Sequence, residues 1–267
     1  RTVLNMTEKK DDESVIPLDR YPNPFDLNAY VEKNKHLLVP PVGNICMLGK
    51  AQAERQFTVM IIGGPNQRTD YHLNEGDEWF WMLKGDMVLK VIDGGEFKDI
   101  PIKEGECFLL PGRVPHSPQR FENTIGMVIE RDRHHWLDEL DGLRWYCPNC
   151  RRVTYDVFFH CTDLGSQLGP VINSYYSDET QRTCKFCGTV DERTSGMRQN
   201  SGTKVHPDLD DWHKNRKIDS SIYPNPQSMI EWIQNNTNSP FPKSMVGPSF
   251  FPYCMRLNAY TKHLIQR

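Results

Sequence analysis

The middle of the chain alternates short apolar runs with turn-forming residues. Each run is about five to seven residues long, and glycine-containing turns separate the runs at intervals of about ten residues, which is the pattern of short strands. The predicted strands span residues 57–62, 78–83, 86–92, 97–102, 106–110 and 126–131. Strands of this length and spacing predict an all-β sandwich or barrel.

Helical periodicity appears on both sides of this region. Asp26 is a candidate N-cap for a helix over residues 27–37, which Pro40 and Pro41 would end. Farther along, residues 153–159 predict another strand and residues 163–176 a helix. A short helix is also predicted over residues 227–235. The expected fold class is therefore all-β with a few helices.

Composition narrows the range of partners. The 267 residues are 37% apolar and 25% charged, and the net charge is -3. We therefore expect a soluble globular protein with no nucleic acid or anionic membrane as partner. The chain has no run of about 18 apolar residues and no signal-peptide pattern at its start. Cytoplasmic localisation is the expectation.

Two histidines and a glutamate stand out as candidate metal ligands. Glu78 begins the apolar run 79–83, and the two-residue period of a strand places it on the same face as Phe80 and Met82. An unpaired carboxylate on an inward face is costly. A lone histidine is more often structural than a ligand, but His72, Glu78 and His116 together make the two-histidine, one-carboxylate set associated with oxygen-using ferrous iron.

Two arginines accompany these residues. Arg68 precedes His72 by four residues and Arg120 follows His116 by four, so in an extended chain each shares a face with its histidine. Arginine binds carboxylates with paired hydrogen bonds, which predicts a small carboxylate substrate beside the metal. Glu130 could pair with an arginine or accept a hydrogen bond from a substrate hydroxyl or amine. Taken singly, all three residues could equally be surface charges.

The spacing of the three ligands resembles that of a cupin barrel. Asn74 stands where many cupins have a further histidine, so three ligands are implied. Over residues 26–190 the chain is similar to the 3-hydroxyanthranilate 3,4-dioxygenase family. The similarity is carried by residues 63–72, 108–111, 114–120 and 129–131.

That resemblance implies roles for individual residues. It makes His72, Glu78 and His116 the ligands of Fe²⁺, and Arg68 and Arg120 the groups that hold the substrate carboxylate. It makes Glu130 a contact of the ring substituents and puts Asn44 and Glu78 beside the substrate.

The resemblance also implies a reaction. Ferrous iron and O₂ would open the ring of 3-hydroxyanthranilate to give 2-amino-3-carboxymuconate semialdehyde, which closes to quinolinate, a precursor of NAD. Another cupin dioxygenase, or a non-catalytic cupin that binds a small carboxylate, stays open as an alternative.

Four cysteines form a second candidate metal site. Cys147 and Cys150 make one C-x-x-C pair, and Cys184 and Cys187 make another. Paired motifs of this kind predict a four-thiolate site for iron or zinc, and a cytoplasmic chain seldom keeps structural disulfides. Short members of the resembled family hold a rubredoxin-like iron there. Because four thiolates leave no open position, we expect a structural role.

The remaining cysteines and histidines have no useful spacing. We expect buried thiols at Cys46, Cys107, Cys161 and Cys254, and assign nothing to His134, His135 or His160.

These patterns divide the chain into four parts. We expect a flexible N-terminal arm at residues 1–25, a cupin catalytic barrel at 26–142, a four-cysteine metal-binding subdomain with a helix at 143–190, and a C-terminal extension at 191–267. The extension loosely resembles the start of the degenerate second cupin half of animal members of the family. Short members form homodimers and long members an internal pseudo-dimer, so the sequence leaves the oligomeric state open.

Overall fold

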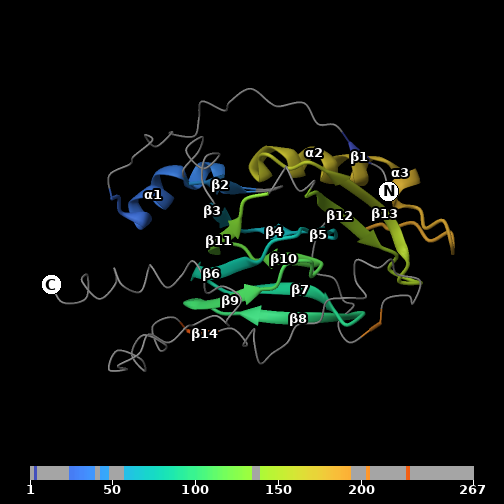
Figure 1. The fold of residues 1–267 in the computed structure, drawn as a ribbon, viewed down its shortest axis with the longest axis horizontal. Helices are drawn as coiled ribbons and strands as arrows, with labels where there is room; N and C mark the ends of the chain where they lie inside the picture. The colour runs from blue at the N-terminus through green and yellow to red at the C-terminus, as the bar shows by residue number, and fades with distance from the viewer. Residues whose placement is uncertain are drawn as a thin grey trace.

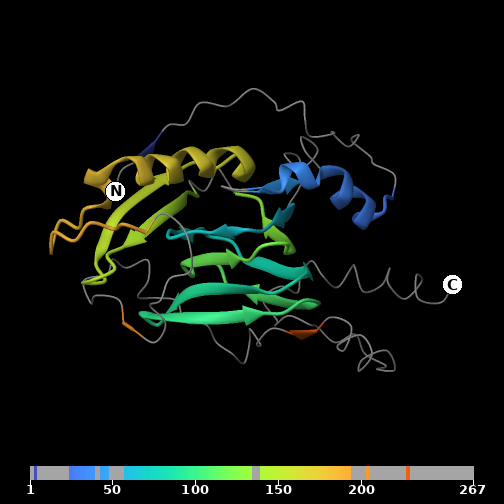
Figure 2. The same ribbon diagram turned by 180° about the vertical axis from the view of Figure 1, so that it is seen from behind.

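The computed structural model describes residues 3–4, 24–39, 43–47, 57–133, 139–193, 203–204 and 227–228. Within these residues the chain forms two β-sheets (Figures 1 and 2). One apolar cluster contains side chains from both sheets, such as Leu89 and Phe80, so the sheets pack face to face with the core between them. This arrangement confirms the expected all-β cupin barrel with a few helices.

The larger sheet has eight strands and the order β1-β13-β12-β5-β10-β7-β8, with β4 also paired to β10. Its strands are β1 (Val3–Leu4), β4 (Asn66–Gln67), β5 (Tyr71–Leu73), β7 (Met87–Asp93), β8 (Glu96–Ile102), β10 (His116–Arg120), β12 (Asp141–Tyr146) and β13 (Val153–Phe159). The cysteine region, residues 143–190, shares this sheet with the barrel, because β12 pairs with β5 on one side and with β13 on the other.

The second sheet has six strands in the order β14-β9-β6-β11-β3-β2. Its strands are β2 (Asn44–Cys46), β3 (Phe57–Gly63), β6 (Glu78–Lys84), β9 (Glu106–Leu110), β11 (Ile125–Arg131) and β14 (Gln227–Ser228). The burial of β6 alternates between buried and partly exposed positions, and its buried residues include Glu78, Phe80 and Met82. The two-residue period thus directs Glu78 into the barrel, as the sequence predicted.

Among the described residues, three helices and one 3₁₀ turn lie outside the sheets. Asp26 caps α1 (Leu27–Asn34) by accepting a hydrogen bond from the Ala29 amide at 2.9 Å. The 3₁₀ turn η1 (Lys35–Leu37) follows, so the α-helix ends earlier than the prolines suggested. Asp163 caps α2 (Leu164–Ser177), and α3 (Glu179–Arg182) follows it. Figure 1 shows α2 lying over β12 and β13, and α1 beside β2 and β3.

Some expectations need correction. The sequence did not predict β4, β5, β10 or β12, because short strands with polar residues lack an apolar run; β10 buries Ser117, Gln119 and Arg120. The helix predicted from Gln227 does not begin there, since Gln227 and Ser228 form β14 against the edge of β9. A sheet edge offers unpaired backbone groups to such a strand.

Several predictions concern residues outside the described ranges. They include most of the N-terminal arm and of the C-terminal extension, residues 229–235 of the predicted helix, and His134, His135 and Cys254. In the part of the chain that the structure describes, no helix has the length and apolar character to cross a membrane.

Candidate metal centre and substrate pocket

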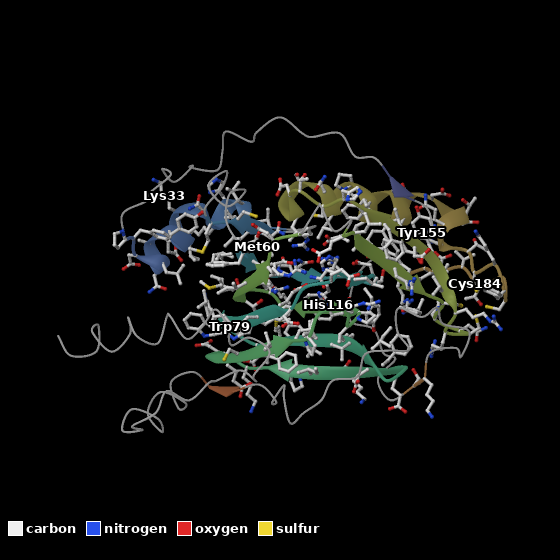
Figure 3. All side chains as sticks on the ribbon, viewed as in Figure 1. Lys33, Met60, Trp79, His116, Tyr155 and Cys184 are labelled. Carbon is white, nitrogen blue, oxygen red and sulfur yellow. The ribbon has the colours of Figure 1, made fainter. Side chains whose placement is uncertain are left out.

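The structure brings His72, Glu78 and His116 together inside the barrel. His72 lies on β5 directly opposite His116 at the start of β10, and Glu78 begins β6 in the facing sheet. Nδ1 of His72 lies 3.3 Å from Nε2 of His116, and Oε1 of Glu78 lies 3.5 Å and 3.1 Å from these two atoms. All three residues are buried. Figure 3 shows His116 in the middle of the molecule.

These three donor atoms fit a metal ion. Two donors at right angles, each about 2.1 Å from an ion, lie about 3.0 Å apart, close to the separations found here. Neutral imidazole and carboxylate donors on one side of an ion leave its other positions open, which is the arrangement of non-haem ferrous oxygenases. The donor set therefore matches the chemistry expected of a catalytic metal.

Neighbouring groups fix the orientation of each ligand. His72 directs Nε2 at Oδ2 of Asp141, 2.7 Å away, and His116 directs Nδ1 at the backbone carbonyl of Val114, 3.0 Å away. Each acceptor holds the proton on the outer nitrogen, which leaves the lone pair of the inner nitrogen free for a metal. The amide of Asn74 donates to Oε1 of Glu78 at 2.7 Å.

The protonation of these ligands reflects their mutual attraction. Burial raises the pKa of Glu78, but the charges and hydrogen bonds of His116 and His72 outweigh this effect and leave the pKa well below its ordinary value. Burial lowers the pKa of His72, but the bonds to Asp141 and Glu78 raise it to about 9.

A pocket opens beside the three ligands. The space between its walls, including the open mouth, is about 450 Å³. Besides the ligands, the lining residues are Asn44, Met60, Ile62, Asn66, Arg68, Phe80, Pro118, Arg120, Val128, Glu130, Leu164 and Leu168. All the predicted site residues of the barrel therefore meet in one cavity.

The two arginines have different surroundings. Arg68 is paired with Asp70, with Nε 3.1 Å from both carboxylate oxygens. Arg120 is 2% exposed, and its Nε has no hydrogen-bond partner among the described residues. Burial and the neighbouring charge of Arg68 lower the pKa of Arg120 to about 10. Arg120 thus brings an uncompensated hydrogen-bond donor to the pocket.

Glu130 faces the pocket from β11 but does not pair with either of these arginines. Its Oε2 lies 2.8 Å from Nη1 of Arg133 and 3.5 Å from the amide of Asn74. Burial raises the pKa of Glu130 to about 7, although Arg133 opposes the change. Across the cavity, the side-chain oxygens of Asn44 and Asn66 have no hydrogen-bond partner within the described residues.

Sequence reasoning missed several residues of the site. Asp141 and Arg133 had no signal, because each is an ordinary charged residue until β12 pairs with β5. Leu164 and Leu168 lie in the helix predicted over residues 163–176, and the structure places them in the pocket wall.

Cys147, Cys150, Cys184 and Cys187 form a cluster away from the pocket. The sulfur of Cys147 lies 3.6 Å from that of Cys187, and the sulfur of Cys150 lies 3.5 Å from that of Cys184. All four sulfurs are within 4.8 Å of one another, and none is in a disulfide. This arrangement fits a metal ion bound by four cysteine thiolates. Figure 3 shows Cys184 well separated from His116.

Two of the other cysteines behave as packing thiols. Cys107 and Cys161 are buried, whereas Cys46 is half-buried. His160 is exposed and outside both clusters.

Known proteins resemble this chain in sequence. A protein of Scheffersomyces stipitis named 3-hydroxyanthranilate 3,4-dioxygenase is 53% identical over 169 residues, which are 63% of this chain and 95% of the relative. A protein of the same name from Xanthomonas campestris is 50% identical and covers 62% of this chain and 91% of the relative.

Among solved structures, the polyketide cyclase RemF of Streptomyces resistomycificus matches 34% of this chain and 66% of its own, with 19% identity and a TM-score of 0.30. The 3-hydroxyanthranilic acid dioxygenase family matches residues 21–176. The chain belongs to the 3-hydroxyanthranilic acid dioxygenase family.

Proposed function

We propose that this protein uses ferrous iron and O₂ to open the ring of 3-hydroxyanthranilate, and that the product is 2-amino-3-carboxymuconate semialdehyde, the precursor of quinolinate. The observation that carries the proposal is the meeting of His72, Glu78 and His116 with two buried arginines in one pocket. The family membership supports the same substrate.

His72, Glu78 and His116 would hold the iron. When bound, ferrous iron supplies redox chemistry that lets O₂ react with the aromatic ring and leaves open positions for both reactants. Asp141 and the Val114 carbonyl keep the two imidazoles in the orientation and tautomer that binding needs.

Arg68 and Arg120 would bind the substrate carboxylate. The unpartnered Nε of Arg120 supports this role, because a buried donor without an acceptor is costly and a carboxylate would satisfy it. Arg68 is held in place by Asp70, so its orientation is set before the substrate arrives. Such preorganisation reduces the entropy lost on binding.

The rest of the pocket would orient the ring. Apolar walls from Ile62, Val128 and Leu168 would contact its faces and exclude water. Glu130 would accept a hydrogen bond from the hydroxyl or amine of the substrate. With a pKa near 7, a carboxyl oxygen of Glu130 can take up or release a proton at neutral pH. Asn44 would lie beside the same substituents.

We extend the proposal to the other features of the chain. Cys147, Cys150, Cys184 and Cys187 would hold a second iron or a zinc in a structural role. We also propose the four-part division at residues 25, 142 and 190, cytoplasmic localisation and the absence of nucleic-acid and membrane partners. A homodimer is one of the two states that the sequence leaves open.

The deciding experiment is anaerobic reconstitution with one metal at a time. Purified protein stripped of its catalytic metal is loaded with Fe²⁺ or with Zn²⁺, and 3-hydroxyanthranilate and air are then added. We expect the near-ultraviolet absorbance of the ring-opened product and O₂ consumption with Fe²⁺ and neither with Zn²⁺. No product with iron demonstrably bound at the triad would refute the proposed reaction, and another cupin activity would have to be sought.

A further inference from the structure

Arg133 joins two buried carboxylates that serve different parts of the site. Its Nε donates to Oδ1 of Asp141 at 2.7 Å, and its Nη2 donates to Oδ2 of the same carboxylate. Its Nη1 lies 2.8 Å from Oε2 of Glu130. One guanidinium thus binds Asp141 with two nitrogens and Glu130 with the third, which uses the planar fork that arginine has and lysine lacks.

Both carboxylates depend on this charge. Asp141 is fully buried and Glu130 is 2% exposed, while 9% of the Arg133 side chain is exposed. A carboxylate in such surroundings is stable only when it is paired and hydrogen-bonded. Removing the guanidinium would therefore leave two buried acids without their shared cation.

The two carboxylates lead to the two halves of the site. Asp141 orients the ligand His72 through a contact of 2.7 Å. Glu130 lines the substrate pocket and lies near Asn74, whose amide holds the ligand Glu78 at 2.7 Å. Contacts therefore run from one metal ligand through Arg133 to the substrate-facing acid and on to a second ligand.

We infer that Arg133 is a positioning residue that fixes the metal-binding His72 and the substrate-facing Glu130 in a single rigid unit. Arg133 is itself neither a ligand of the triad nor one of the residues that line the pocket. Its effect on both passes through the carboxylates that it holds. The role given to Glu130 rests on the proposed function, whereas the effect on His72 does not.

The inference predicts a distinctive pattern in two binding measurements. Asp141→Asn should weaken metal binding more than substrate binding, because Asp141 is the carboxylate that contacts His72 directly. Glu130→Gln should weaken substrate binding more than metal binding, because Glu130 lines the pocket. Arg133→Gln should weaken both, each by about tenfold or more, which is the usual effect of losing a group that orients a metal ligand.

Metal affinity is measured first, without O₂ or substrate, by competition for Fe²⁺ with a chelator. The affinity for 3-hydroxyanthranilate is measured separately on the iron-loaded protein under anaerobic conditions. The matched control is Arg131→Gln. Arg131 precedes Arg133 by two positions, and its partly exposed guanidinium pairs with Glu139. It should change neither affinity.

If Arg133→Gln does not fold, Arg133→Lys replaces it. Lysine keeps the positive charge but lacks the planar fork that binds both carboxylates, so this variant should lose part of its affinity for metal and part of its affinity for substrate. The double variant Arg133→Gln with Asp141→Asn should bind metal no worse than whichever single variant has the lower metal affinity. Both changes act on metal binding through the same contact between Asp141 and His72. Folded Arg133 variants with both affinities unchanged, or with only one reduced, would overturn the inference. If the unaltered protein fails to bind 3-hydroxyanthranilate, the proposed function fails and the metal measurements still decide whether Arg133 positions His72.

Discussion

The buried ion pair between Arg68 and Asp70 separates the tasks of the two arginines in the pocket. Two nitrogens of Arg68 bind Asp70, and Asp70 is fully buried, so the positive charge of Arg68 is already balanced. Among the residues that the structure describes, Arg120 has no such partner at its Nε. A carboxylate in this pocket would therefore satisfy a donor of Arg120 that the folded chain leaves without an acceptor among the described residues.

Replacing Arg120 by alanine should weaken substrate binding and leave the metal in place. Loss of hydrogen bonds to a charged group costs about 1.5–3 kcal/mol, which corresponds to a rise in Kd of about 10- to 150-fold. The rise is measured by anaerobic titration of the iron-loaded protein with 3-hydroxyanthranilate, and iron per chain is measured in parallel. Arg131→Ala serves as the control. Loss of iron from the Arg120 variant would instead make this residue part of the support of the metal ligands.

The sequence predicted the parts of the site that depend on local periodicity. The two-residue period of strands places Glu78 with Phe80 on the inner face, and the four-residue offsets place Arg68 and Arg120 beside their histidines. The Arg68–Asp70 pair could have been found in the same way, because residues two apart share a face of an extended chain.

Other parts could not be predicted because their signal is not local. Asp141 reaches His72 only when β12 pairs with β5, although 69 positions separate the two residues along the chain. Arg133 gains its role only through that same pairing. Strand β10 buries polar side chains whose hydrogen bonds are formed in the folded protein, such as Gln119 to the Arg68 carbonyl at 2.9 Å. An apolar pattern cannot reveal such a strand.

Removal of one thiolate should empty the cysteine site. In Cys150→Ser we expect bound metal to fall by one ion per chain while the triad keeps its metal, because the two clusters are separate. A metal present at about 100 times its Kd stabilises the folded chain by about 2.7 kcal/mol. A domain of this size shifts by roughly 2–4 °C per kcal/mol, so the thermal midpoint should fall by at least about 5 °C. Metal analysis and calorimetry measure both effects. Cys107→Ser, at a buried thiol outside the cluster, should keep all its metal; equal loss in the two variants would speak against the site.

Gly142 keeps β12 close to β13 and so keeps Asp141 in place. A Cβ at this position would lie 2.6 Å from Cε1 of the buried Phe158 ring, which is far inside contact distance. Gly142→Ala should therefore destabilise the protein by about 1–3 kcal/mol, the usual cost of overpacking. Urea unfolding measures the loss. In contrast, a Cβ at Gly169 on α2 meets no atom of the described residues within 4 Å, so Gly169→Ala should be neutral or stabilising. Equal stability of the two variants would contradict the packing argument.

Acid should remove the contribution of Asp191 to the stability of the folded protein. This residue follows the cysteine region and is hydrogen-bonded to α2. Its Oδ2 accepts a hydrogen bond from the Tyr175 hydroxyl at 3.0 Å, and its Oδ1 accepts one from Nε of Arg193 at 2.7 Å. Burial raises the pKa of Asp191, but the bonds and charge of Arg193 outweigh burial and hold the pKa below its ordinary value of 3.8. The ionised form therefore stabilises the folded protein.

The sign of this effect sets the pH range. With a pKa that is lower in the folded than in the unfolded chain, the stabilisation is complete above the ordinary pKa of 3.8 and disappears as the pH falls through the folded value. At pH 7 the free energy of unfolding of the unaltered protein should be about 1.5–3 kcal/mol higher than that of Asp191→Asn. Urea titrations should find this difference constant between about pH 7 and 5 and shrinking below about pH 4. Because both proteins carry the same cysteine site, acid release of its metal cancels in the comparison. A difference that persists or grows in acid would mean that Asp191 acts through its shape and not through its charge.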